Sequence, residues 1–220
     1  MLQTILDIWS EYNGEYISGL ITTLQISIIA LIASLALGTV IAILCISPFR
    51  ILVIIGRSYI EFIRNTPLLI QIFFFYFGLS SVGIQMSSFV AGTLGLTVYT
   101  AAFISEAIRA GINSIPRGQM EAARASGLSY IQAMRYVILP QAFKIVIPPL
   151  GNQFINLVKN SSLLGVIAGM DLMYHADIVA SNTFNTFETY ILVAVFYLTI
   201  TVPLSILVNW LERRLKVKHA

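Results

Sequence analysis

The stretch "GQMEAARASGLSYIQAMRYVILP" (residues 118–140) is polar and rich in small residues, whereas long apolar segments lie on both sides of it. Good helix formers fill 119–125, and Gly127 is typical of a helix C-terminus. Pro140 is expected to end or bend whatever helix follows. The small residues would let another surface approach the backbone closely: Ala122, Ala123, Ala125 and Ser126. From spacing alone, the short helix is either a docking element or an ordinary solvated loop.

The composition defines the class of protein. Hydrophobic residues make up 57% of the 220 residues, and charged residues only 10%. A soluble domain of this length carries roughly a quarter charged residues. The chain is therefore expected to be an integral membrane protein with residues 1–220 in a single transmembrane domain. The lone cysteine, Cys45, excludes an intramolecular disulfide.

Five segments are long and apolar enough for membrane-spanning helices, which need about 20 residues. They cover roughly 20–46, 51–79, 92–110, 137–158 and 189–211, and polar residues interrupt the second at 61–67. The segment "SSLLGVIAGMDLMYHADIV" (161–179) is broken by glycines and polar residues, which favours a short, half-buried helix near the outer side. The expected fold class is an all-α integral membrane protein with five transmembrane helices.

The distribution of basic residues predicts the orientation. No Lys or Arg precedes Arg50, whereas Asp7, Glu11 and Glu15 come before the first span. Basic residues gather between spans three and four and after span five: Arg109, Arg117, Arg124, Arg135, Arg213, Arg214, Lys216 and Lys218. The positive-inside rule then puts the N-terminus outside, and residues 118–140 and the C-terminus in the cytoplasm. A cleaved signal peptide is not expected, because no basic segment precedes a short apolar one.

Four motifs carry a family resemblance. "EAARASG" (121–127) followed by "VILP" (137–140) resembles the EAA loop of permeases of ATP-binding-cassette (ABC) importers, with Val137 where isoleucine is usual. Three further segments resemble the branch that imports polar amino acids: "FIRNTPLLIQIFFFYFGL" (62–79), "SEAIRAGINSIPRGQ" (105–119) and "LVKNSSLLGVI" (157–167). The chain is identified as a member of this permease family from these ordered motifs.

The resemblance implies a type I ABC importer permease fold in a prokaryotic cell membrane. In the family, the loop at about 113–140 holds a coupling helix that docks on a separate ATPase subunit. The residues that match the docking motif are Glu121, Ala122, Ala123, Arg124, Gly127 and Pro140. ATP and magnesium belong to that ATPase, since this sequence has no phosphate-binding loop. The other implied partners are an extracytoplasmic substrate-binding protein and a second permease, either an identical copy or a paralogue. No cofactor, nucleic acid or catalytic arrangement is expected on this chain.

Charged residues inside spans indicate a substrate path, because they are costly in lipid. Glu61 and Arg64 lie one helical turn apart, just before Asn65-Thr66-Pro67. Pro67 disfavours helical geometry at the preceding residue, so we expect the span to break here and to expose backbone groups to a ligand. A local Glu61–Arg64 ion pair is the alternative. A second pair, Glu106 and Arg109, favours structural pairing, with a cytoplasmic gate as the alternative.

Polar residues also gather where span four ends. Asn152 and Asn156 share a helix face, and Ser161 and Ser162 follow a predicted helix break, so we expect all four to line the path rather than to hold helices together. Asp171 either faces the path or caps the following helix through its carboxylate. His175 and Asp177 (without metal-ligand partners) are expected to be solvated.

An acidic Asp171 on the path would attract cationic substrates. The sequence therefore favours basic amino acids (arginine, lysine or histidine), with glutamine or another polar amino acid as the alternative. A secondary transporter or an ion channel is the alternative of a different class, and the EAA loop argues against it. A non-transporting scaffold is disfavoured by the polar residues inside the spans.

Overall fold

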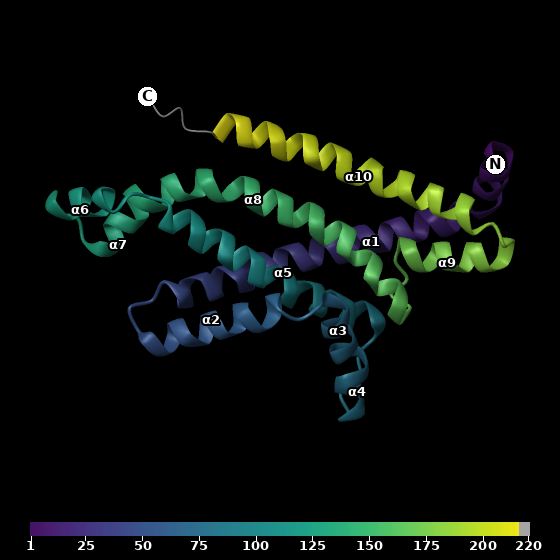
Figure 1. Ribbon diagram of the computed structural model, residues 1–220, viewed down its shortest axis with the longest axis horizontal. Helices are drawn as coiled ribbons and strands as arrows, with labels where there is room; N and C mark the ends of the chain where they lie inside the picture. Colours follow the sequence, from purple (N-terminus) through teal and green to yellow (C-terminus); the bar gives the residue numbers. More distant parts are fainter. Residues whose placement is uncertain (216–220) are drawn as a thin grey trace.

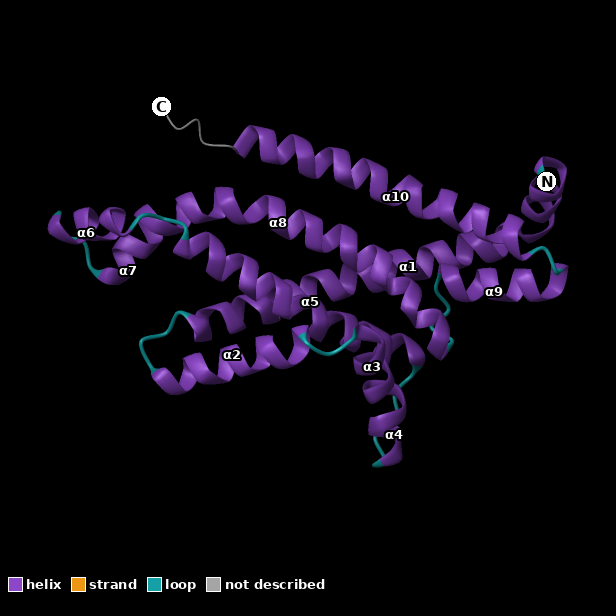
Figure 2. Ribbon diagram, in the orientation of Figure 1, coloured by secondary structure: helices purple, strands orange, loops and turns teal. Residues whose placement is uncertain are grey.

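The computed structural model describes residues 1–215, and every regular element in this part of the chain is helical (Figure 2). Lys216 and Lys218, part of the basic C-terminus, lie outside the described residues. In chain order, the α-helices are α1 (Leu2–Cys45), α2 (Arg50–Arg64), α3 (Leu68–Phe73), α4 (Leu79–Ser81), α5 (Ser88–Asn113), α6 (Arg117–Ala125), α7 (Tyr130–Ala133), α8 (Leu139–Asn160), α9 (Leu172–Thr183) and α10 (Thr186–Leu215). Two π-helical turns, Phe74–Gly78 and Met134–Ile138, and a 3-10 helix, Ser161–Ile167, connect some of them.

Five spans are consistent with this architecture. Helices α1, α5 and α10 are each long and apolar enough to cross a membrane. Two bent pairs also qualify if each is counted as one span: α2 with Leu68–Ser81, bent by 104°, and Tyr130–Ile167 with α9, bent by 50°. The first helix begins well before residue 20, and its N-terminal turns leave the main axis at Tyr12, where the backbone is not helical.

The two ends of the molecule carry different elements. Helices α6 and α7 and the last turns of α10 lie toward one end, whereas α9 and the N-terminus lie at the other (Figure 1). This arrangement agrees with a loop at 113–140 on the same side as the C-terminus. Which of the two ends faces the cytoplasm stays a prediction from the basic residues.

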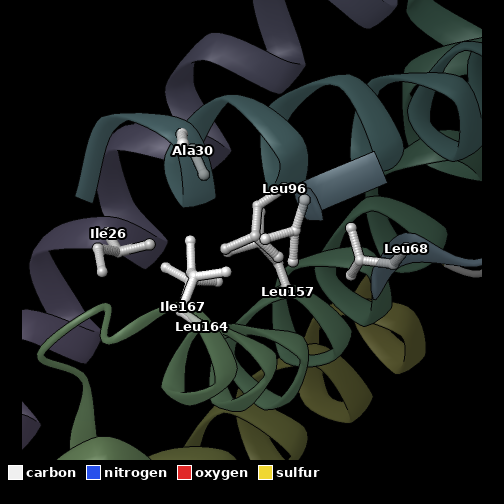
Figure 3. Packing of buried hydrophobic residues seen from close by; sticks show 9 residues of the cluster. Ile26, Ala30, Leu68, Leu96, Leu157, Leu164 and Ile167 are labelled. Carbon is white, nitrogen blue, oxygen red and sulfur yellow. The ribbon is translucent and has the colours of Figure 1, made fainter. Parts of the chain in front are cut away.

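The core is a set of aliphatic side chains from four regions of the chain. Ile26 and Ala30 of α1 meet Leu68 of α3, Leu96 of α5 and a group at the end of α8 (Figure 3). That group consists of Leu157 of α8 and of Leu164 and Ile167 of the 3-10 helix that follows it. Burial from water drives such packing weakly inside a bilayer, so close fit matters more. The core therefore holds α3 and the end of α8 against α1.

Helix α10 carries part of the apolar outer surface. Its exposed side chains Val195, Leu198, Val202 and Ile206 recur every three or four residues and so form one stripe. A helix whose exposed stripe is aliphatic at membrane depth is suited to contact with lipid. This stripe gives a reference surface against which the polar face described below can be compared.

Pro140 does not end its helix, so of the two expected outcomes, an end or a bend, the end is wrong. The helical chain begins at Tyr130 and runs on through α8, so the fourth span starts earlier than residue 137. Ser129 forms a capping box with Gln132 at its start. Proline lacks the N–H that an α-helix needs, and a wider π-helical turn at Met134–Ile138 directly precedes Leu139 and Pro140. The π turn thus carries the helix across the proline.

Candidate functional site

A charged cavity of about 290 Å³ lies between α2 and α5. Its lining residues are Arg57, Ile60, Glu61 and Arg64 from α2, and Glu106 and Arg109 from α5. The α2 residues are spaced by three and four, which places them on one helix face. Ile60 is buried, whereas the charged side chains of α2 are exposed in the single chain. The sequence pointed to four of these residues separately; it did not single out Arg57, nor did it predict that one cavity unites them.

Glu106 and Arg109 form a bidentate ion pair. The Arg109 Nε donates to Glu106 Oε2 at 3.0 Å, and Nη2 donates to Oε1 at 2.5 Å. The expectation of structural pairing is confirmed. Glu61 and Arg64 do not form the alternative local ion pair, since the Arg64 guanidinium lies over the Phe103 ring at 5.3 Å from its centroid. Arg64 and Glu61 therefore keep charge available in the cavity.

The position of these charges along the helices identifies a face that is unsuited to lipid. Arg57 lies seven residues, or about 10 Å, into α2, and Arg64 about 20 Å into it. Guanidinium groups at such depth face protein or water in membrane proteins, because lipid cannot solvate them. The face of α2 and α5 that carries the cavity is therefore charged, whereas the exposed stripe on α10 is aliphatic.

The predicted break in the second span is confirmed. Helix α2 ends at Arg64, Pro67 is the residue before α3, and the two helices meet at 104°. Side chains of the break bond to carbonyls of α2: Asn65 Nδ2 to Glu61 O at 2.7 Å, and Thr66 Oγ1 to Phe62 O at 2.8 Å. The expectation that the break leaves its carbonyl groups free for a ligand is therefore wrong for these two carbonyls. A path role for Asn65, Thr66 and Pro67 stays a prediction.

Gln71 completes the break and was missed by sequence reasoning. Its Nε2 donates to Ile63 O at 2.9 Å and to Thr66 O at 3.1 Å, so one amide of α3 binds two carbonyls that precede Pro67. The side chain is buried, and its Oε1 has no partner among the described residues. The only sequence signal was a single amide within the apolar run "LLIQIF".

The polar residues at the end of α8 divide into two groups. Asn152 and Asn156 are exposed in the single chain, and their side chains make no hydrogen bond within the described residues. Ser161 and Ser162 instead donate to carbonyls of their own helical segment, at 2.8 Å each. Ser161 is fully buried. A path role is compatible with the exposure of the two asparagines, and for all four residues it stays a prediction.

Asp171 is the N-cap of α9. Its Oδ2 accepts from the Met173 backbone N–H at 3.1 Å. The Leu172 N–H, between these two residues, donates to Thr23 Oγ1 of α1 at 3.0 Å. The side chain is fully buried, and among residues 1–215 its Oδ1 has no hydrogen-bond partner. The capping alternative is confirmed; contact with a substrate stays a prediction. The Tyr197 hydroxyl of α10 lies within electrostatic range of Asp171 and was not expected there.

Helix α9 is fixed by two more polar contacts. His175 Nδ1 lies 2.5 Å from Glu15 Oε2 on α1, and the Tyr190 hydroxyl of α10 donates to Asp177 Oδ1. The expectation that His175 is solvated is wrong, because only 12% of its side chain is exposed. Gly19 permits the α1 contact: a Cβ there would lie 2.7 Å from the Leu172 Cα.

The polar stretch that opened the sequence forms the predicted short helix, α6. It ends in two backbone bonds, Gly127 N–H to Arg124 O at 3.1 Å and Leu128 N–H to Ala123 O at 3.2 Å. These bonds define a Schellman motif, which requires the left-handed φ of +88° at Gly127. Arg124 Nη1 adds a bond to Leu128 O at 2.9 Å. The loop is a fixed structure rather than a loose connection.

The exposed face of α6 differs from the expected one. Glu121, Ala122 and Ala125 are exposed, as expected for a docking surface. Ala123 is only 7% exposed and faces the chain itself, so its expected place on the thin outer surface is wrong. The reason is that the chain turns back after Gly127, and α7 and the π-helical turn Met134–Ile138 pack against α6.

Helices that span a membrane, a broken span with charged residues beside it, and a rigid helical loop between α5 and α8 define the permease subunit of an ABC importer. The profile of the family described as binding-protein-dependent transport system inner membrane component matches residues 34–217. The chain belongs to this family, as an amino-acid ABC transporter permease. The resemblance and the fold class inferred from the sequence are confirmed.

Relatives and solved structures narrow the comparison. The chain is 60% identical to the probable glutamine ABC transporter permease protein GlnM of Bacillus subtilis (strain 168), over 93% of this chain and 94% of the relative. It is 37% identical to the probable amino-acid ABC transporter permease protein YckA of the same organism, over 90% of this chain and 88% of the relative. A crystal structure of an amino acid ABC transporter with histidines matches with a TM-score of 0.89 and 41% identity, covering 93% and 96% of the two chains. An inward-facing MetNI methionine ABC transporter shares the fold, with a TM-score of 0.70 and 20% identity, covering 94% of this chain and 96% of the other.

Proposed function

We propose that this chain is the permease subunit of an importer for glutamine. The observation that carries the proposal is the 60% identity to the Bacillus subtilis glutamine permease over nearly the whole of both chains. A second relative of that organism, the probable glutamine permease GlnP, is 35% identical over 95% of this chain and 99% of the relative. The proposed substrate is thus an amino acid with a polar but uncharged side chain.

The basic-substrate prediction is not confirmed. It rested on an acidic Asp171 facing the path, and the Asp171 carboxylate is instead buried as the cap of α9. The charges that remain open to a cavity are on α2, where Arg57 and Arg64 outnumber Glu61. A cationic side chain would be repelled by that excess, whereas the neutral side chain of glutamine is not.

The proposed partners are an ATPase pair, an extracytoplasmic binding protein and a second permease, which we take to be a second copy of this chain. With the N-terminus outside, α6 faces the cytoplasm and docks on the ATPase through its exposed side chains. The Schellman motif fixes the C-terminal end of α6, which lies between α5 and α8 in the chain. Movement of the ATPase is therefore transmitted through α6 to both helices. Because α5 forms one wall of the charged cavity, this movement changes access to it.

Uptake into vesicles tests the proposal. The chain is reconstituted with its ATPase and binding protein, and uptake of labelled glutamine and labelled arginine is compared with and without ATP. ATP-dependent glutamine uptake that excess unlabelled arginine does not suppress is the expected result. Uptake of arginine in preference to glutamine would contradict the assignment and return the substrate to the basic class.

A further inference from the structure

The charged cavity between α2 and α5 has an unequal balance of charge. Five of its six lining residues are charged: three arginines and two glutamates. The bidentate bond between Glu106 and Arg109 neutralises one charge of each sign. The remaining charged groups are the Arg57 and Arg64 guanidiniums and the Glu61 carboxylate. The cavity thus offers two positive groups and one negative group to whatever enters it.

These groups are suited to the backbone portion of an amino acid. A guanidinium binds a carboxylate through paired N–H donors, and a carboxylate accepts hydrogen bonds from an ammonium group. The Arg64 guanidinium lies over the ring of Phe103 and makes no ion pair or hydrogen bond among the described residues. Arg57 makes no ion pair or hydrogen bond among the described residues.

The cavity reaches the break in the second span at one end, because Arg64 directly precedes Asn65, and extends from there along α2. Arg57 lies ten residues before Pro67, or about 15 Å along α2, and the N-terminal end of α2 lies toward α6 (Figure 1). An amino acid that passes the break on its way to the α6 side meets this cavity afterwards. The one uncharged lining residue, Ile60, is aliphatic. The part of α2 that lines the cavity therefore has no further polar group that could select the side chain of the amino acid.

We propose that Arg57, Arg64 and Glu61 form an inner transit site, which binds the α-carboxylate and α-ammonium groups of the amino acid between the break and the α6 side. The inference rests on the proposed function only in taking the cargo to be an amino acid. It does not depend on which side chain the cargo carries, because every α-amino acid has the same two groups. Arg57 and Arg64 hold the carboxylate, and Glu61 holds the ammonium.

Equilibrium binding to the purified complex of permease and ATPase, without ATP and without the binding protein, tests the site. Labelled glutamine is the probe, and the competitors are unlabelled glutamine and its α-amide, which lacks the carboxylate. We expect the α-amide to compete at least about tenfold more weakly than glutamine for the wild-type complex. In Arg57→Gln, we expect about tenfold weaker glutamine binding and loss of this discrimination, with Arg57→Lys between the two.

Arg50→Gln is the matched control. It removes the same side chain from the same helix, seven residues away and outside the cavity, and should leave both affinities unchanged. Size-exclusion chromatography and the ATPase rate report whether each variant complex is intact. Unchanged glutamine binding in an intact Arg57→Gln complex would overturn the proposal, as would a wild-type complex that binds no amino acid. Loss of pairing between permease copies, with binding per intact complex unchanged, would assign these charges to the subunit interface instead.

The two proposals fail in different ways. If the vesicles import arginine rather than glutamine, the glutamine assignment falls. The inner transit site still stands if binding of labelled arginine is weakened by Arg57→Gln, and it falls if that binding is unchanged.

Discussion

The Gln71 Nε2 donates to the Ile63 carbonyl at 2.9 Å, across the bend where α2 ends and α3 begins. The two residues lie on opposite sides of Pro67, which cannot donate a backbone N–H. The amide of Gln71 therefore replaces a hydrogen bond that a continuous helix would have made itself. Its second bond, to Thr66 O, fixes the other carbonyl at the bend. Gln71 therefore stabilises the bend together with the side chains of Asn65 and Thr66.

Gln71→Leu should destabilise the chain by about 1 kcal/mol, because Thr66 O loses its donor and Ile63 O keeps only the Thr66 N–H at 3.3 Å. A lower thermal midpoint of the purified complex, together with reduced glutamine uptake, is the expected result. Gln141→Leu is the control, since the Gln141 amide bonds only to Val137 O within its own helix. Equal effects of the two substitutions would show that the bend does not need Gln71.

Asp171→Asn should keep glutamine uptake close to that of the wild type, because an asparagine side chain can also accept from the Met173 N–H. Asp171→Ala should cost about 1 kcal/mol of stability through loss of the cap. Thermal unfolding and uptake of the two variants separate the roles. A stable Asp171→Asn chain with no uptake would mean that the substrate needs the charge of Asp171.

Gly19→Ala should weaken the contact between α9 and α1, since the added Cβ would lie 2.7 Å from the Leu172 Cα. We expect a lower thermal midpoint, because backbone at this crossing cannot move aside cheaply. Gly14→Ala is the control on the same helix, where a Cβ meets no atom within 4 Å. No difference between the two midpoints would contradict the close packing.

Ala122→Trp should prevent co-purification of the permease with its ATPase, because Ala122 is exposed on α6 and a large ring there would block a docking cleft. The fold of the isolated permease should be unaffected. Ala123→Trp should instead strain the loop by about 1–3 kcal/mol, since Ala123 is buried against its own chain. Normal co-purification of Ala122→Trp would remove this face of α6 from the interface.

The break in the second span and the extent of α6 could be predicted from the sequence. The contacts between residues far apart in the sequence could not. Pro67 restricts the residue before it, so the break was predictable from one position. Gly127 and the helix formers before it likewise fix the extent of α6 to within two residues. Gln71 was not predictable as a bond across the bend, because an amide in an apolar run carries no periodicity that says which carbonyl it meets.

Long-range contacts decided the remaining differences. Asp171 caps α9 locally, but its burial depends on packing against α1, where Thr23, far away in the sequence, accepts from the neighbouring Leu172 N–H. Ala123 could point outward or inward, and the return of the chain after Gly127 placed it inward. Arg57 was not singled out by the sequence, because its cavity is built with residues of α5 some fifty positions later.

The most direct test of the central claim compares two faces of the chain in the vesicle-reconstituted complex. Cys45 is first replaced by serine, and single cysteines are then placed at Glu61, in the charged cavity, and at Val202, on the aliphatic stripe of α10. A charged, membrane-impermeant thiol reagent should modify the cysteine at 61 and not the one at 202, and glutamine should slow the reaction. Equal reactivity at both positions, or none at position 61, would contradict a water-accessible substrate path along α2 and α5.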